Sequence, residues 1–255
     1  MNNHKSFIAL PYGLFLTLFV ILPFFVILYY ALTDSTGAFT LVNFTHFFTN
    51  PKTMGTLVYS LLISVLTTVI CLILAYPTAY ILAKGGLKRS TVYLILLVVP
   101  MWINFTLRIT ALKEILTLLQ GNIAYYPFFN TIVCMVYDYL PFMLLPIYNC
   151  LSEIGDEYGE AAMDLGADRV STFFRVILPF SLPGIISGIM MVFLPTMTDY
   201  VILDMIYNST YIMGSLIGSY FSSYDWNNGS MISVVLLSLI MMVNLAADWV
   251  IKKRG

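Results

Sequence analysis

Three aspartates, Asp138, Asp199 and Asp204, lie within long apolar stretches of the sequence. A charged side chain in an apolar environment is costly, so such residues indicate functional sites by default. Carboxylates in that position can attract a cationic solute, and the faces of nearby aromatic rings attract the same charge. The candidate aromatic residues are Trp102, Tyr137, Tyr139 and Tyr200. The alternatives are a hydrogen bond from Asp138 to a neighbouring helix and interfacial solvation of Asp204.

Other patterns that carry chemistry are missing from the sequence. There is no G-x-x-x-x-G-K-[ST] phosphate-binding loop, and residues 84–88 (KGGLK) form only a basic turn. No nucleophile or metal-ligand constellation is present, and Cys71, Cys134 and Cys150 lie in apolar runs as small hydrophobic residues. We therefore expect no catalytic residue, metal or cofactor in this chain. If ATP drives its activity, the ATPase is expected to be a separate polypeptide.

The composition determines the environment in which these residues lie. The chain has 255 residues, of which 60% are hydrophobic and only 10% are charged. Ordinary soluble domains carry about 25% charged residues. A chain this poor in charge cannot cover its surface with polar groups, which excludes a soluble enzyme, a disordered regulator and a nucleic-acid-binding protein.

Six apolar stretches are long enough to position the aspartates across a membrane. A helix needs about 20 apolar residues to cross a bilayer. The stretches cover approximately residues 7–32, 56–83, 91–107, 130–151, 181–207 and 231–251. The sequence therefore predicts an all-α, polytopic membrane protein with six transmembrane helices in a single domain, 1–255.

The basic residues predict how these helices are oriented. Nine of the twelve lie on one side of the predicted membrane, and cytoplasmic connections are enriched in Lys and Arg. The nine are Lys5, Lys84, Lys88, Arg89, Arg169, Arg175, Lys252, Lys253 and Arg254, and the other side carries Lys52, Arg108 and Lys113. Both termini are therefore predicted to be cytoplasmic.

The loop at 152–178, between the fourth and fifth stretches, is acidic although it is predicted to be cytoplasmic. Gly166 stands where a helix is expected to stop, because glycine adopts the left-handed conformation without strain. Asp168 can then cap a second helix, which Pro179 is expected to end. The apolar residues at helical spacing are Ala161, Ala162 and Leu165, then Val170, Phe173, Phe174 and Ile177.

This helix–turn–helix segment has two possible roles. Its small turn, flanked by an acid and two alanines, suits insertion into a groove on another protein. Alternatively, the segment rests on the membrane or on neighbouring helices. Periodicity alone does not distinguish the two roles.

The same loop carries a pattern of fixed spacing. Glu160-Ala161-Ala162 is followed by three residues, Gly166, nine residues, Val176, one residue and Leu178-Pro179. This pattern resembles the EAA signature of ABC-importer permeases, with Val176 in place of Ile as the single departure. The resemblance implies the type I ABC importer permease fold, in which the loop is a coupling helix that docks into a cytoplasmic ATPase subunit. By resemblance, Glu160 and Gly166 shape the docking turn, and Ala161 and Ala162 permit close approach.

Less specific motifs cover more of the chain. Residues 100–104 (PMWIN) with 107–109, residues 136–143 (VYDYLPFM) and residues 182–186 (LPGII) are similar to segments of spermidine/putrescine permeases, and of the B-type in particular. The resemblance implies a second permease subunit of the C-type, two ATP-binding subunits that use ATP and Mg, and an extracytoplasmic polyamine-binding protein. It also implies a bacterial inner membrane. Transport would proceed by alternating access, with this chain forming half of the pore.

Two alternatives remain open from the sequence. Permeases for another small cation or organic solute share parts of the less specific motifs. A stand-alone secondary transporter could instead use Asp138 as a proton carrier. The sequence does not indicate a preference between spermidine and putrescine.

Overall fold

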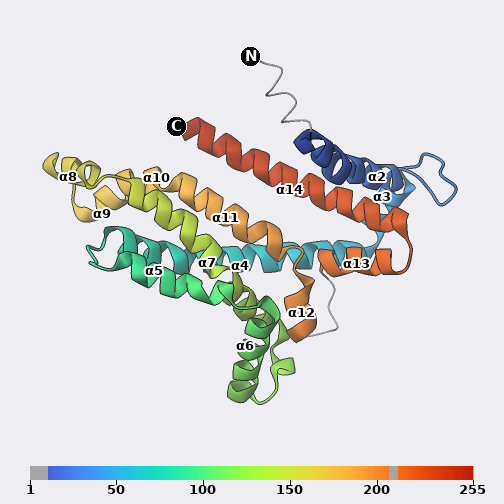
Figure 1. The fold of residues 1–255 in the computed structure, drawn as a ribbon, viewed down its shortest axis with the longest axis horizontal. Helices are drawn as coiled ribbons and strands as arrows, with labels where there is room; N and C mark the ends of the chain where they lie inside the picture. The colour runs from blue at the N-terminus through green and yellow to red at the C-terminus, as the bar shows by residue number, and fades with distance from the viewer. Residues whose placement is uncertain (1–10, 207–211, 255) are drawn as a thin grey trace. The chain divides into compact units, whose positions relative to one another are not determined.

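A computed structural model describes residues 11–206 and 212–254 of the chain (Figure 1). These residues are almost entirely helical and form no strand, and an isolated antiparallel bridge joins Thr33 and Phe39. The all-α prediction is therefore confirmed. Residues 7–10 and Tyr207 of the predicted membrane stretches, and Lys5 of the predicted cytoplasmic basic residues, lie outside the described residues.

The chain divides into two compact units. The first contains the chain up to residue 57 together with residues 213–242, and the second contains residues 58–212 and 243–255. Helix α4 (Pro51–Lys84) and helix α14 (Trp226–Arg254) contribute to both units.

Hydrogen bonds from side-chain amides hold the first unit together at the end of its first helix. Asn227 Nδ2 donates to the carbonyl oxygens of Tyr30 at 3.1 Å and Thr33 at 2.7 Å, and Asn43 Nδ2 donates to the Thr33 oxygen at 2.9 Å. Of these acceptors, Tyr30 is in the last turn of its helix, where carbonyls lack intrahelical partners, and Thr33 follows the helix. The helical elements of this unit are η1 (Thr17–Ile21), α2 (Leu22–Ala31), α3 (Val42–Thr49) and α13 (Met213–Ser222), with parts of α4 and α14.

The core of the second unit forms where α7 (Pro127–Glu153) packs on α11 (Leu182–Thr196), which run side by side in Figure 1. Two glycines allow this close approach. A Cβ on Gly184 would lie 2.6 Å from Cys150 Cβ, and one on Gly188 would lie 2.7 Å from Met143 Sδ. The other helical elements of this unit are α5 (Ser90–Val98), η2 (Val99–Trp102), α6 (Phe105–Gln120), η3 (Ile123–Tyr125), α8 (Asp156–Asp164), α9 (Arg169–Thr172), η4 (Phe173–Ile177), α10 (Leu178–Phe180) and α12 (Tyr200–Ile206), with parts of α4 and α14.

Four described helices are long and apolar enough to cross a membrane, and the number is six if each of two bent helix pairs counts as one span. The predicted six corresponds to the larger number. The four straight candidates are Pro11–Ala31, Pro51–Lys84, Pro127–Glu153 and Trp226–Ala247. The bent pairs are Ser90–Trp102 with Phe105–Gln120, at 98°, and Arg169–Phe180 with Leu182–Thr196, at 60°.

The predicted third and fifth stretches are not continuous helices. The third breaks at residues 103–104, where Asn104 caps α6 by accepting hydrogen bonds from the backbone N–H groups of Thr106 and Leu107. The fifth breaks at residues 197–199, after Pro195. Hydropathy did not predict these breaks, because the apolar character continues across a cap or a proline.

Candidate functional site

The loop that carries the EAA pattern forms a helix, a tight turn and a second helix, as predicted. Helix α8 ends in a Schellman motif, in which Ala167 N–H donates to the Ala162 carbonyl at 3.1 Å and Gly166 N–H donates to the Met163 carbonyl at 2.9 Å. Gly166 has a φ of 90°, a conformation that is strained for any residue with a Cβ. The glycine is therefore required by the backbone of the turn.

Asp168 begins the second helix, as its position after the turn predicted. Its Oδ1 accepts a hydrogen bond from Ser171 N–H at 3.2 Å. The hydrogen bonds from Ser171 hold the pKa of the Asp168 carboxyl below its ordinary value. The cap fixes the direction in which the chain leaves the turn.

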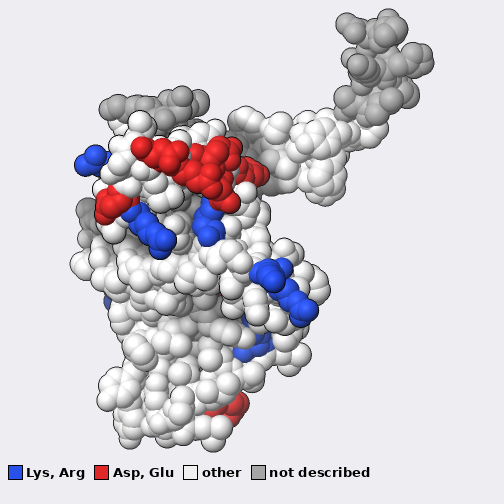
Figure 2. Space-filling view, turned by 90° about the vertical axis from the view of Figure 1, so that its left-hand side faces the viewer, with Lys and Arg blue, Asp and Glu red and all other residues white. Residues whose placement is uncertain are grey.

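The outer side of this turn is exposed. Leu165 is 91% exposed at its tip, and Val170 and Phe174 are also exposed. Glu160 is exposed and lines a hollow of about 390 Å³ between the end of α4 and helices α8 and α9. Figure 2 shows that acidic side chains gather in a band on this face, and the exposed acids of the segment are Glu153, Asp156, Glu157, Glu160, Asp164 and Asp168.

The inner side of the same segment packs on the rest of its unit. The ring of Phe173 makes edge contacts with Tyr76 and Tyr80, with centroids 5.9 and 5.3 Å apart, and Ile177 is buried. Half of the predicted apolar stripe therefore anchors the segment to neighbouring helices, while Val170 and Phe174 remain exposed. The segment therefore rests on neighbouring helices through one face, and its other face is exposed.

The prediction that Pro179 ends the second helix is wrong. The helix continues through a π-helical turn, η4, into α10, where Pro179 is the second residue. The Leu178 N–H bonds the Phe173 carbonyl across the π-helical turn, and the helix ends one residue after Pro179. The actual bend of 60° follows Phe180. Leu178 packs half-buried against the core, and Pro179 is exposed.

A salt bridge connects the start of the loop to α4. Lys84 Nζ lies 2.7 Å from Asp156 Oδ1 and also donates a hydrogen bond to the Ile154 carbonyl. The side chain of Lys84 is largely buried, whereas that of Asp156 is exposed. The sequence identified Lys84 only as a marker of orientation, and the structure adds a role in positioning α8.

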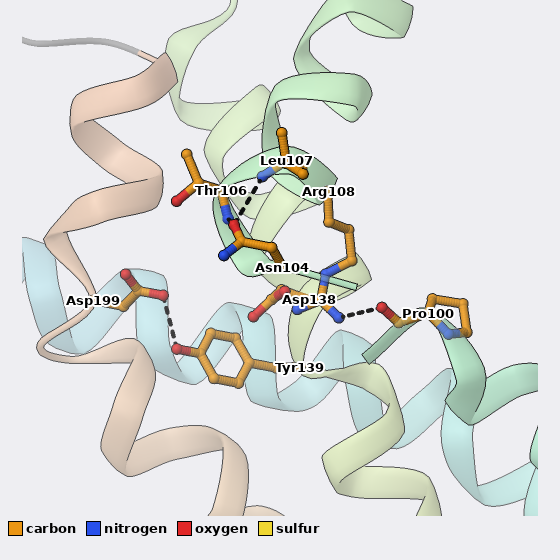
Figure 3. Close-up of polar contacts among 8 residues, drawn as sticks. All are labelled: Pro100, Asn104, Thr106, Leu107, Arg108, Asp138, Tyr139 and Asp199. Carbon is orange, nitrogen blue, oxygen red and sulfur yellow. Dashed lines mark hydrogen bonds and ion pairs between the residues drawn. The ribbon is translucent and has the colours of Figure 1, made fainter. Parts of the chain in front are cut away.

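A second polar cluster lies inside the unit, on α7 (Figure 3). Asp138 is 3% exposed and forms an ion pair with Arg108, which is 8% exposed. Arg108 Nη1 also donates to the Pro100 carbonyl at 3.0 Å. The Nε atom of Arg108 has no hydrogen-bond partner within the part of the chain that the structure describes.

The next residue on α7 makes a separate contact. Tyr139 Oη donates to Asp199 Oδ2 at 2.8 Å, and Asp199 Oδ1 accepts from Val201 N–H at 3.2 Å (Figure 3). Asp199 is half-buried at the break between α11 and α12. Asp138, Tyr139 and Asp199 are thus three predicted site residues that the structure brings into one region.

The other predicted site residues are exposed. Trp102 is 82% exposed, Tyr137 is 41% exposed, and Asp204 and Tyr200 are exposed. No aromatic face among these is buried beside Asp138 or Asp199. Of the six residues predicted to line a substrate path, the structure therefore brings three together, namely Asp138, Tyr139 and Asp199.

Arg108 is the residue that the sequence analysis missed. It was assigned to the basic residues of the outer side, although it is buried and holds the carboxylate of Asp138. The signal was available in principle, because a buried carboxylate needs a partner and Arg108 is adjacent to an apolar stretch. Which basic residue would reach Asp138 depended on how α6 packs on α7, which the sequence did not reveal.

Comparisons with known proteins agree with the loop pattern. Residues 65–253 match the family described as "Binding-protein-dependent transport system inner membrane component". The chain is 33% identical over 100% of its length to the spermidine/putrescine transport system permease protein PotB of Haemophilus influenzae, of which it covers 98%. It is 34% identical to PotB of Escherichia coli, over 83% of this chain and 82% of that protein.

Solved structures with the same fold come from ABC transporters. A chain of a bacterial alginate ABC transporter, solved with an alginate-bound periplasmic protein, matches with a TM-score of 0.72 and 13% identity, over 95% of this chain and 92% of that chain. A chain of the inward-facing MetNI methionine ABC transporter matches with a TM-score of 0.62 and 16% identity, over 81% of this chain and 99% of that chain. At this identity the similarity shows the fold alone.

Proposed function

This chain belongs to the family of binding-protein-dependent transport system inner membrane components, and from that premise we propose that it is the permease subunit of an ATP-driven polyamine importer. The names of the relatives from Haemophilus influenzae and Escherichia coli support spermidine or putrescine as the cargo.

The observation that carries the proposal is the exposed, acidic turn that ends at Gly166. Its apolar tip, Leu165, and its outward residues Val170 and Phe174 remain uncovered, although the inner residues are packed. Exposed apolar residues rimmed by charge are typical of a protein–protein interface. We assign this surface to docking of an ATP-binding subunit, with Glu160, Ala161 and Ala162 on the helix that enters the interface.

The proposed assembly contains several further chains. Two ATP-binding subunits would hydrolyse ATP with Mg, and a second permease subunit of the C-type would complete the pore. An extracytoplasmic polyamine-binding protein would deliver the cargo. The chain would cross the bacterial cell membrane several times with both termini in the cytoplasm, because the basic residues are concentrated on that side.

Transport would follow from movement of the docking turn. Closure of the ATP-binding subunits would displace α8 and α9, and the contacts of Phe173 and Ile177 would transmit that displacement to the helices on which they pack. The salt bridge from Lys84 to Asp156 fixes the other end of the segment to α4. The pore would then open alternately to the two sides of the membrane.

The test is uptake by the reconstituted complex. The four kinds of subunit are co-expressed, purified and inserted into proteoliposomes with ATP and Mg enclosed, and labelled spermidine or putrescine is supplied with the binding protein. We expect ATP-dependent uptake, with competition between the two polyamines. A hydrolysis-deficient ATP-binding subunit serves as the matched control.

Other results would contradict the proposal. ATP-dependent uptake of another small cation or organic solute, without competition by polyamines, would contradict the cargo and retain the importer. Uptake by this chain alone, driven by a proton gradient in the absence of ATP, would replace the importer with a secondary transporter.

A further inference from the structure

Two consecutive residues of α7 hold two different broken helices. Asp138 pairs with Arg108, next to the break between α5 and α6. Tyr139 donates to Asp199, at the break between α11 and α12. Figure 3 shows the two side chains extending from α7 toward these two breaks. Two adjacent residues on one long helix therefore contact the segments at both breaks.

Arg108 spans the first break. It lies in the first turn of α6, after the 98° bend, and its guanidinium reaches back to the Pro100 carbonyl before the bend. The same guanidinium binds the Asp138 carboxylate. Arg108 thus fixes three segments at once, namely η2, α6 and α7.

Asp199 likewise connects two segments at the second break, between α11 and α12. One carboxylate oxygen accepts from Tyr139, and the other accepts from the N–H of Val201 at the start of α12. The carboxylate therefore both caps α12 and ties its first turn to α7.

The two helices beyond the breaks are also linked to each other. Lys113 Nζ, on α6, donates to the Met205 carbonyl of α12 at 2.6 Å. α6 and α12 are consequently expected to move together if either one leaves α7. A displacement would have to release Asp138 and Tyr139.

The burial of the ion pair between Arg108 and Asp138 favours a role in positioning over a role in stability. A buried ion pair is often no more stable than well-packed apolar residues, because desolvation offsets the attraction. Arg108 Nε, which lacks a partner among the described residues, adds a further cost. A cluster that serves stability alone would be expected to satisfy all of its donors.

We propose that Arg108 is a positioning residue of the transport cycle, which clamps the α5–α6 break to Asp138 and releases it when the pore changes its direction of opening. Tyr139 and Asp199 form the equivalent clamp on α12. The proposal rests on the proposed transport function, and it adds the residues at which the cycle is held. It predicts that the clamp can be removed without loss of the fold.

The test separates an effect on the stability of the complex from an effect on how the binding protein stimulates ATP hydrolysis. The full complex is purified with wild-type chain, with Arg108→Met, with Asp138→Leu, with the double variant R108M/D138L and with Tyr139→Phe. Thermal unfolding, ATPase activity with and without the binding protein, and hydrogen exchange over residues 99–110 and 199–206 are measured. Glu114→Gln serves as the control, because this carboxylate on α6 is exposed and lies outside both measured segments.

We expect each single charge deletion to lower the unfolding temperature and the double variant to recover most of it, because no buried charge is left unpaired. The double variant should still show faster exchange at residues 99–110 and several-fold higher ATPase activity without the binding protein. Tyr139→Phe should accelerate exchange at residues 199–206. The proposal would be overturned if the stable double variant showed wild-type hydrogen exchange and a wild-type dependence of ATPase activity on the binding protein.

A second variant covers the case in which the double variant does not fold. Arg108→Lys keeps the charge, but an ammonium cannot bond Asp138 and Pro100 in the fork geometry of a guanidinium. Unchanged exchange at both breaks in Arg108→Lys and Tyr139→Phe would also overturn the clamp. A wild-type complex that couples ATP hydrolysis to the binding protein but imports no polyamine would contradict the proposed cargo and leave the exchange test valid.

Discussion

The docking turn at Gly166 and the buried cluster around Asp138 use charge in opposite ways. The turn exposes six acidic side chains, and Asp168 keeps its charge by capping a helix. The cluster buries one carboxylate with one guanidinium. In water an exposed charge costs little and contributes little to stability. In the interior the same charge is tolerated only with a partner.

The difference indicates how each region is expected to respond to substitution. Changes in the turn should alter binding of a partner and leave the fold intact. Changes in the cluster should first alter the fold, and they reveal an effect on transport only when both charges are removed together.

Asp138→Asn should have the largest effect. It leaves the Arg108 guanidinium buried without its carboxylate, which costs about 3–5 kcal/mol in comparable sites. The complex should unfold at a lower temperature and be recovered in lower yield, as measured by thermal unfolding in detergent. Asp204→Asn, at an exposed aspartate, is the control. Equal unfolding temperatures for the two variants would contradict the assignment of Asp138 as a buried charge.

Gly166→Ala should have a smaller effect on stability and a specific effect on assembly. A Cβ in the left-handed conformation costs about 1–2 kcal/mol. Gly121→Ala is the matched control, because Gly121 also has a positive φ and open space around it but ends α6 instead of the docking turn. Only Gly166→Ala should reduce the amount of ATP-binding subunit that co-purifies. The same loss in both variants would show that general strain is the cause.

Leu165→Ser should leave stability within about 0.5 kcal/mol, as expected for an exposed position. It should nevertheless weaken docking, because Leu165 is the apolar tip of the turn. Leu118→Ser is the control, since Leu118 on α6 is comparably exposed, at 85%. Titration of the purified ATP-binding subunit against each permease measures the difference. Equal affinities would remove Leu165 from the interface.

Acidification should have the smallest effect, confined to the start of α9. The pKa of Asp168 is lower in the folded chain than its ordinary value of 3.8, so the cap is fully effective above that value. The stabilisation is lost as the pH falls through the lower pKa of the folded state. Hydrogen exchange at residues 169–172 should therefore accelerate only at strongly acidic pH. Asp168→Asn, which caps without titrating, should abolish this dependence. An unchanged pH profile in Asp168→Asn would contradict the assignment.

Local signals in the sequence predicted the docking turn in detail. Gly166, Asp168 and the spacing of the apolar residues depend on interactions within a few residues, and the structure shows the cap and the turn where they were expected. The prediction for Pro179 was wrong by one residue, because the helix runs through the π-helical turn η4 into α10 and ends at Phe180. Such a turn depends on packing as well as on residue type.

The buried cluster was predicted only in part. Asp138, Tyr139 and Asp199 were identified from their apolar surroundings, but their partner Arg108 was assigned to an outer connection. Arg108 and Asp138 are 30 positions apart on α6 and α7, and they meet because these two helices pack on each other. Trp102 and Tyr137 were grouped with the cluster on residue type, and the structure leaves them exposed.

Composition, hydropathy and local spacing determined that this chain is a helical membrane protein with a helix–turn–helix segment on one loop. Each of these properties depends on a short segment of the chain, because burial in lipid, helix capping and glycine turns act between residues close in sequence. Tertiary structure decided which charges meet, where the long stretches break and which half of an apolar stripe is covered. Those outcomes depend on contacts between residues distant in sequence, and a helix that is apolar throughout gives no indication of which neighbour it will pack against.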